Sequence, residues 1–240
     1  LGRNPARIIP AWRAFLDDHS AQGRPARGIG EPIWAGRRPE EVAESQLHEA
    51  LLNVAVEPDT PFWLICPYDV SRLDPEVIEE AYRSHPAVVT GAEYRGSHLY
   101  GGRAHVDLVF SSELPELDGR LDEVTFSMTD VHQLAPFVTR IATLAGAKPD
   151  KSADLALAVQ ELAASSLQRG ARAGQVRILT RNDALICEVK DEVVVHDPMT
   201  GRKATPKTQR TGLWIANQLC DLVQLRSTAN GTTVRVHHWL

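Results

Sequence analysis

The feature that most constrains the fold of this chain is the order of its patterned segments between residues 121 and 238. Short apolar runs of strand length are separated by two tight turns, Asn182-Asp183 and Ala229-Asn230-Gly231, which are typical of β-hairpins. Strands are expected at residues 121–127, 175–180, 184–190, 222–227 and 232–238, and helices at residues 130–145, 152–168 and 212–221. The order β-α-α-β-β-α-β-β predicts an α+β sandwich, with the helices on one face of a mixed or antiparallel sheet.

The first part of the chain predicts a separate α/β domain. Helices are expected at residues 8–16, 40–56 and 76–84, and residues 62–66 form a short, wholly apolar run. Such a run is typical of a central parallel strand that is buried on both faces. Periodicity then fails from residue 88 to residue 119, in a stretch rich in glycine and acidic residues. We therefore expect domains at residues 1–90 and 120–240, joined by a connector at residues 91–119.

The composition excludes several classes of protein. The 240 residues are 43% hydrophobic and carry a net charge of −5, which gives no general attraction to nucleic acid or to an anionic membrane. No apolar run approaches the roughly 20 residues that span a bilayer, and the N-terminus lacks the apolar segment of a secretory signal. Cys66, Cys187 and Cys220 lie far apart in apolar runs, which predicts buried thiols rather than a disulfide or a metal site. These features favour a cytoplasmic location, and we expect residues upstream of Leu1 to be missing.

Three motifs fall on the expected elements of the second domain. Glu161 and Ser165 stand four residues apart on a helix, so their side chains share one face. Asp191 follows the strand at 184–190. The loop 201–210 contains four basic residues and no acid, and it leads to Gly212 at the start of a helix. The free N–H groups and the dipole of such a helix start favour an anion.

These motifs, in this order, resemble the ATP-binding fold shared by gyrase, histidine kinases and MutL-type proteins (the GHKL or Bergerat fold), and within it the bacterial anti-sigma serine/threonine kinases. The resemblance implies that Glu161 acts as general base or orients the attacking hydroxyl. It implies that Ser165 replaces an asparagine that helps to hold Mg²⁺, and that Asp191 accepts a hydrogen bond from adenine. Further ATP contacts are implied at Arg210, Thr211, Gly212, Leu213, Thr232 and Thr233.

Several family positions have changed in this chain. Ser165 is shorter than the asparagine that it replaces, although a hydroxyl can still ligate Mg²⁺. Val193 and Val195 stand where the family has glycines, and Arg210 stands where it usually has another glycine. A branched Cβ restricts φ and occupies space near the nucleotide. Binding of ATP and Mg²⁺ is therefore expected to be degenerate, and the sequence leaves kinase activity open.

The resemblance implies a cytoplasmic anti-sigma regulatory factor. Its partners would be a sigma factor and an anti-anti-sigma (STAS-type) protein, a serine of which it would phosphorylate if it is active, and a homodimer is compatible with this role. The alternative is an ATP-independent protein-interaction scaffold. A sensor histidine kinase is disfavoured, because residues 88–120 contain no pair of long helices for dimerisation.

The first domain resembles the MEDS (methanogen/methylotroph, DcmR sensory) domain. The resemblance rests on residues 2–12, on 30–34 with 48–53, and on 64–69 with 85–86. It implies a decayed, mostly parallel RecA-like domain that senses a small molecule. Ligand sites of α/β sheets lie at the carboxyl ends of strands, which favours Cys66, Tyr68 and Asp69 as the rim of a sensory pocket.

A metal site is an alternative interpretation of the same region. His48, Cys66 and His85 are soft ligands on neighbouring expected elements. Their spacing matches no standard zinc pattern, and Cys66 ends an apolar strand. Core packing with hydrogen bonds at strand ends is therefore the favoured interpretation, and a metal ion is the alternative.

Overall fold

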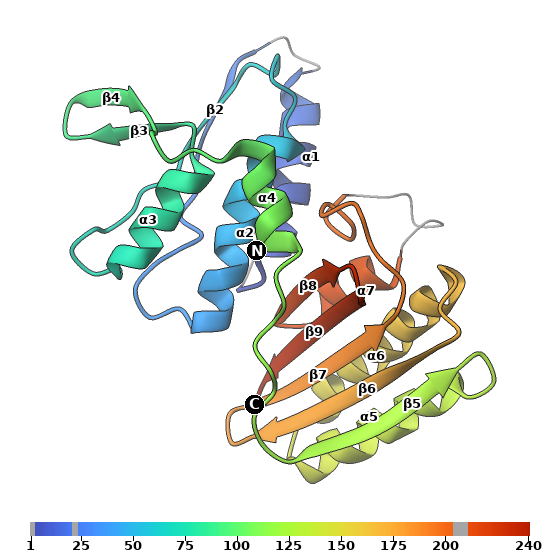
Figure 1. Ribbon diagram of the computed structural model, residues 1–240. Coiled ribbons are helices and arrows are strands. Elements are labelled where there is room, and N and C mark those ends of the chain that lie inside the picture. Colours follow the sequence, from blue (N-terminus) through green and yellow to red (C-terminus); the bar gives the residue numbers. More distant parts are fainter. Residues whose placement is uncertain (1–2, 21–23, 204–210) are drawn as a thin grey trace. The chain divides into compact units, whose positions relative to one another are not determined.

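The computed structural model describes residues 3–20, 24–203 and 211–240, and the chain forms two compact units (Figure 1). One unit contains residues 3–7 and 111–240, and the other contains residues 8–110. Among the described helices, none is both long and apolar enough to cross a membrane.

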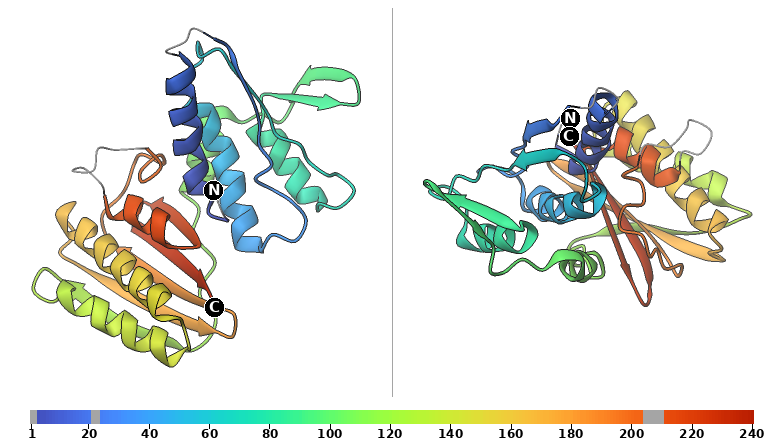
Figure 2. Two further views of the ribbon diagram at one scale, coloured as in Figure 1. Left: turned by 180° about the vertical axis from the view of Figure 1, so that it is seen from behind. Right: turned by 90° about the horizontal axis from the view of Figure 1, so that it is seen from above.

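The unit that includes residues 111–240 is built on a five-stranded antiparallel sheet. The strands are β5 (Leu121–Ser127), β6 (Ala173–Arg181), β7 (Ala184–Asp191), β8 (Leu222–Thr228) and β9 (Gly231–Trp239), in the order β5-β6-β7-β9-β8. One face is covered by α5 (Leu134–Leu144), α6 (Pro149–Gln168) and α7 (Gly212–Leu219), as Figure 2 shows from behind. Two 3-10 turns, η1 (Pro5–Arg7) and η2 (Val131–Gln133), complete the unit. The predicted α+β sandwich is confirmed.

The other face of this sheet carries a strap formed by residues 111–120. Successive side chains of a strand point to opposite faces, so Ala184 and Ile186 of β7 lie on the same side. Both pack with Leu179 and with Leu117 of the strap. The Arg235 guanidinium also donates a hydrogen bond of 2.7 Å to the carbonyl of Pro115. The strap therefore lies against the face that the helices leave open.

Residues 8–110 are organised around α2 (Pro39–Ala55). This helix contacts α1 (Ile8–Ser20), α3 (Pro75–Ser84) and α4 (Gly102–Phe110). Leu47, Ala50, Leu51 and Ala55 are buried at helical spacing, so that α2 supplies much of the core. The strands form two pairs: β1 (Ala26–Ile29) runs parallel to β2 (Phe62–Ile65), and β3 (Ala87–Thr90) forms an antiparallel hairpin with β4 (Glu93–Gly96).

The mostly parallel, RecA-like sheet predicted for this unit is not confirmed. The described residues contain one parallel pair and one hairpin. The expectation that the apolar strand at 62–66 is buried on both faces is wrong, because Trp63 and Ile65 are 53% and 48% exposed. Phe62 packs against Trp12 of α1, with the ring centroids 5.5 Å apart. One face of β2 therefore packs against α1, while Trp63 and Ile65 point to the opposite face, which is exposed.

The stretch predicted as a connector, residues 91–119, contains regular structure in its first part. β4 and α4 both lie within it, and residues 111–119 belong to the strap. These elements are short and lie among glycines, so neither has enough turns or alternations to show a period in the sequence.

Candidate functional site

The start of α7 lies directly against α6 at Glu161. A Cβ atom at Gly212 would lie 2.1 Å from the Glu161 carbonyl oxygen, so glycine is required for this close approach. Thr211 caps the helix, because its hydroxyl accepts a hydrogen bond of 3.4 Å from the Trp214 backbone N–H. Leu213 is buried, and Glu161 is partly buried. The structure thus brings Glu161, Thr211, Gly212 and Leu213 to one junction.

Asp191, at the end of β7, already has two partners. Its carboxylate accepts a hydrogen bond of 2.8 Å from the Val193 N–H, and the Arg169 guanidinium lies 3.8 Å from its other oxygen. Arg169 also donates to the Ser165 hydroxyl at 2.8 Å. Partial burial lowers the pKa of Arg169, and the negative charge of Asp191 opposes that effect. Arg169 therefore joins Ser165 of α6 to Asp191 of β7.

This arrangement does not fit the ligands that the family resemblance implies. A Mg²⁺ ion at the Ser165 hydroxyl would lie close to the guanidinium of Arg169, and like charges repel strongly where water is partly excluded. The Asp191 side chain is 3% exposed, and both of its oxygens face donors of the protein itself. Ser165 and Asp191 thus already have partners within the chain.

The loop after β7 is held by β8 and β9. The described chain has no non-glycine residue with positive φ, so Val193 and Val195 adopt ordinary backbone conformations. The Thr232 hydroxyl donates to the Val193 carbonyl at 2.5 Å, and the Val195 N–H donates to the Ser227 hydroxyl at 2.8 Å. Thr232 is fully buried. The loop that carries Val193 and Val195 is therefore fixed beside Asp191 by these hydroxyls.

The two candidate threonines of β9 lie on opposite faces of the sheet. Thr232 stands opposite Asp191 in the register of β7 and β9. Thr233 is the next residue, so its side chain points to the strap side. It lines a pocket there together with Lys190, Glu188 and Arg226. The structure therefore separates Thr233 from Asp191.

The described part of the basic loop begins as a tight turn. Asp197 accepts a hydrogen bond of 2.9 Å from the Met199 N–H, and its other oxygen lies 3.0 Å from the Lys203 ammonium. Gly201 has a φ of 76°, which favours glycine at the end of the turn. Arg202 is 3% exposed. The predicted contact residue Arg210 lies outside the described residues.

The predicted sensory residues follow β2 in the other unit. Asp69 is exposed, and its carboxylate accepts hydrogen bonds from the Ser71 hydroxyl (2.6 Å) and N–H (3.1 Å). These bonds lower the pKa of Asp69 below its ordinary value. The Tyr68 ring packs edge-on against His85, with the centroids 5.8 Å apart. Asp69 therefore closes a surface turn, while Cys66 and Tyr68 lie closer to His85.

Cys66 lies beside two ionisable side chains from other elements. A ligand atom from each of Glu49, Cys66 and His85 falls within 4.8 Å of the other two. His48, the ligand proposed from the sequence, is not part of this group. His48 and Glu49 are adjacent on α2, and adjacent helix residues point about 100° apart around the axis. Only one of them can therefore face the end of β2, and that residue is Glu49.

Sequence reasoning missed two of the residues that determine these sites. Arg169 stands four residues after Ser165 on the same helix, so the i, i+4 spacing could have identified the contact. Glu49 is a buried carboxylate in an otherwise apolar part of α2. Glu41 and Glu44 of the same helix are buried as well. Charged side chains are usually exposed, so the sequence gives no sign of this burial.

Comparison with protein families gives two matches. Residues 124–237 match the histidine kinase-like ATPase domain, and residues 1–86 match the MEDS domain, the methanogen/methylotroph, DcmR sensory domain. Both resemblances seen in the sequence are confirmed.

Comparison with individual proteins gives one structural similarity and no match among curated proteins. Among solved structures, the chain is similar to the RsbU and RsbW domains of Rv1364c from Mycobacterium tuberculosis, with 15% sequence identity and a TM-score of 0.39. The match covers 50% of this chain and 32% of that chain, so it spans about a third of the length of that structure.

Proposed function

We propose that this chain is a cytoplasmic anti-sigma regulatory factor. Its ATPase-like unit binds a sigma factor and an anti-anti-sigma protein of the STAS type, under control of the sensory unit. The observation that carries this proposal is the match of residues 124–237 to histidine kinase-like ATPase domains, in a unit whose sandwich is complete. The fold is intact, while Ser165 and Asp191 of the candidate nucleotide site are engaged by Arg169. This combination favours a protein that acts by binding other proteins.

Partner binding is tested with purified proteins. The chain is mixed with each member of a panel of sigma factors from its source organism, and complexes are detected by size-exclusion chromatography with light scattering, which also gives the oligomeric state. We expect co-elution with at least one sigma factor and its release by a STAS-type protein. If no sigma factor of the panel binds at micromolar concentrations, the proposal is wrong.

Two modes of action remain within this function. Transfer of a phosphoryl group to a serine of the STAS protein is favoured by the Glu161–Gly212 junction, where the backbone of α6 at Glu161 meets the start of α7, an end of a helix that favours anions. An ATP-independent scaffold is favoured by the Arg169 bridge between Ser165 and Asp191. The bridge engages both side chains that would otherwise be available to ligands, so we favour the scaffold.

Calorimetric titration with Mg²⁺ and ATP separates these modes. For a scaffold, the wild type gives no heat at millimolar ATP, whereas Arg169→Ala frees Ser165 and Asp191 and gains measurable affinity. For a kinase, the wild type binds ATP and phosphorylates the STAS protein, and Glu161→Gln abolishes phosphorylation while ATP binding is retained. Phosphate-affinity electrophoresis of the STAS protein measures that product.

A further inference from the structure

The unit of residues 8–110 brings a sulfur, a nitrogen and an oxygen ligand together from three elements. Glu49 lies on α2, Cys66 directly follows β2, and His85 directly follows α3. Their ligand atoms lie within 4.8 Å of one another. Thiolate, imidazole and carboxylate are the three side-chain groups that bind Zn²⁺ in proteins. The cluster thus has the donor set of a transition-metal site.

The orientation of His85 is determined by a backbone hydrogen bond. Its Nδ1 lies 2.8 Å from the Ala81 carbonyl oxygen, which can only accept, so Nδ1 carries the proton. The lone pair is then on Nε2, which lies 3.8 Å from Oε2 of Glu49. Metal-binding histidines commonly donate their second ring N–H to a backbone carbonyl in this way. The tautomer of His85 is therefore the one that a metal ion requires.

The distance between Glu49 and His85 also suits a shared ion. At 3.8 Å, Oε2 and Nε2 are too far apart for a hydrogen bond. Two ligands at about 2.0–2.1 Å from a tetrahedral zinc ion lie roughly 3.3 Å apart. A small inward movement of either side chain would bring both atoms to bonding distance from one ion.

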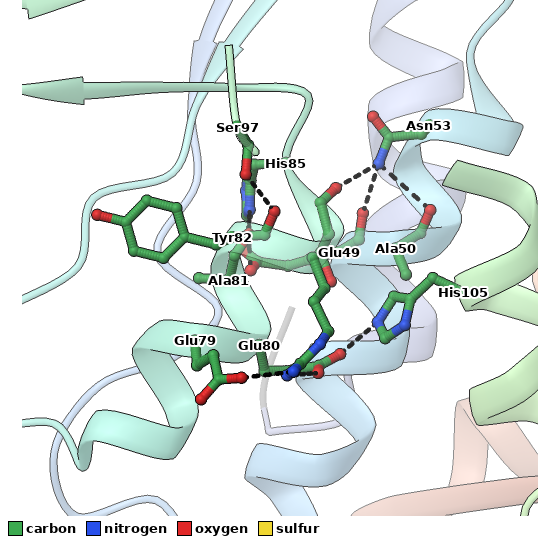
Figure 3. A network of polar contacts seen from close by, with 12 residues as sticks. Glu49, Ala50, Asn53, Glu79, Glu80, Ala81, Tyr82, His85, Ser97 and His105 are labelled. Carbon is green, nitrogen blue, oxygen red and sulfur yellow. Dashed lines mark hydrogen bonds and ion pairs between the residues drawn. The ribbon is translucent and has the colours of Figure 1, made fainter. Parts of the chain in front are cut away.

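The supporting contacts hold the cluster in place. The Asn53 side chain on α2 donates to the Ser84 carbonyl at 2.7 Å, and thereby fixes the end of α3 one residue before His85. The Ser97 hydroxyl donates to the Tyr82 carbonyl at 2.5 Å in the same part of the chain (Figure 3). Tyr68 limits rotation of the His85 ring from the other side. The ligands therefore belong to a connected framework rather than to mobile surface side chains.

A cation would also compensate the burial of Glu49. Its side chain is 1% exposed, and among the described residues neither of its carboxyl oxygens has a hydrogen-bond partner. A metal ion would place a positive charge beside this buried carboxyl group. His85 is 22% exposed, which leaves a path to solvent.

We propose that Glu49, Cys66 and His85 form a binding site for a borderline transition-metal ion of the Zn²⁺ type. Three protein ligands leave the fourth tetrahedral position open to water or to a small molecule, as in zinc sites that bind exogenous ligands. The site lies in the unit that matches the MEDS domain family, whereas the candidate nucleotide site lies in the other unit.

Titration of the purified chain with Co²⁺ tests this site, because cobalt replaces zinc and reports a thiolate ligand by a near-ultraviolet charge-transfer band. We expect one Co²⁺ per chain, displaced by Zn²⁺, and no band in Cys66→Ala. His85→Gln should bind at least about ten-fold more weakly. The matched control is His98→Ala, which removes an exposed histidine of the same unit and should bind as the wild type does.

Glu49→Gln distinguishes a metal site from a packing role. It keeps the shape of the side chain and removes the buried carboxyl group, so the metal-free variant should fold at least as well as the wild type by circular dichroism. Its Co²⁺ affinity should nevertheless fall at least about ten-fold. The proposal is overturned by the lack of a thiolate band in the wild type, by a band that persists in Cys66→Ala, or by unchanged affinity in Glu49→Gln.

Discussion

Asp221, immediately before β8, binds three groups through its carboxylate. The Lys151 ammonium lies 3.3 Å away, Nδ1 of His238 lies 2.9 Å away, and the Trp239 N–H donates at 3.0 Å. Partial burial raises the pKa of Asp221, but the bonds from His238 and Trp239 and the charge of Lys151 outweigh it and hold the pKa well below its ordinary value. The ionised form therefore stabilises the fold above the unfolded-state pKa of about 3.9, and this contribution is lost as the pH falls towards the folded-state pKa.

We expect Asp221→Asn to lower the free energy of unfolding by roughly 1–3 kcal/mol at neutral pH. The difference in the free energy of unfolding between this variant and the wild type should shrink as the pH falls from about 5 to about 2, because the wild-type carboxylate becomes protonated in that range. Urea unfolding at several pH values measures both effects. Asp118→Asn removes an exposed carboxylate of the strap and should change little. An Asp221→Asn effect that does not vary with pH would contradict the pKa argument.

The residues of the candidate nucleotide site could be found from the sequence only in part. The spacing of Glu161 and Ser165 places both on one face of α6, and Gly212 marks the start of α7. The sequence could not show that Arg169 fills the space left by the shorter Ser165, since this depends on how α6 approaches β7. Likewise, the separation of Thr232 from Thr233 follows only from the strand register. Both features depend on how the elements pack in three dimensions, which the sequence does not show directly.

At the scale of elements, the start of α7 approaches the backbone of α6 very closely. Alanine at position 212 would gain about 1 kcal/mol of helix propensity, but its Cβ would lie 2.1 Å from the Glu161 carbonyl oxygen. Because the obstacle is backbone, α6 and α7 must move apart. We expect Gly212→Ala to lower the free energy of unfolding by about 1–3 kcal/mol, measured by chemical denaturation. Gly96→Ala, whose Cβ would meet its nearest atom at 4.0 Å, should be close to neutral.

Elements with strong local signals were predictable, and elements that depend on distant neighbours were not. The sandwich follows from long helical periods and from the turns at Asn182-Asp183 and at Gly231, where a φ of 124° requires glycine. In contrast, the apolar run of β2 predicts burial on both faces, although burial also needs neighbouring elements on each side. β4 and α4 are short and lie beside glycines, so that tertiary contacts rather than a sequence period determine them.

At the scale of the whole molecule, the structural division differs from the family boundaries near the N-terminus. The MEDS match begins at residue 1, but residues 3–7 belong structurally to the ATPase-like unit. Arg7 donates to the carbonyls of Asn217 (2.6 Å), Gln218 (3.0 Å) and Cys220 (2.8 Å). These carbonyls belong to the C-terminal end of α7, where backbone acceptors lack helical partners and a positive charge is favourable. The chain then continues directly into α1 of the other unit.

Two arginines close in sequence should consequently report on different units. Arg7→Ala removes the cap of α7 and should cost roughly 1–3 kcal/mol in the ATPase-like unit. Arg13→Ala is the matched control, because Arg13 donates at 2.8 Å to the carbonyl of Ala55 at the end of α2. Hydrogen exchange should show faster exchange of the α7 amides in Arg7→Ala and of the last turn of α2 in Arg13→Ala. If Arg7→Ala accelerates exchange in α2 and leaves α7 unchanged, residues 3–7 belong with the unit of residues 8–110 instead.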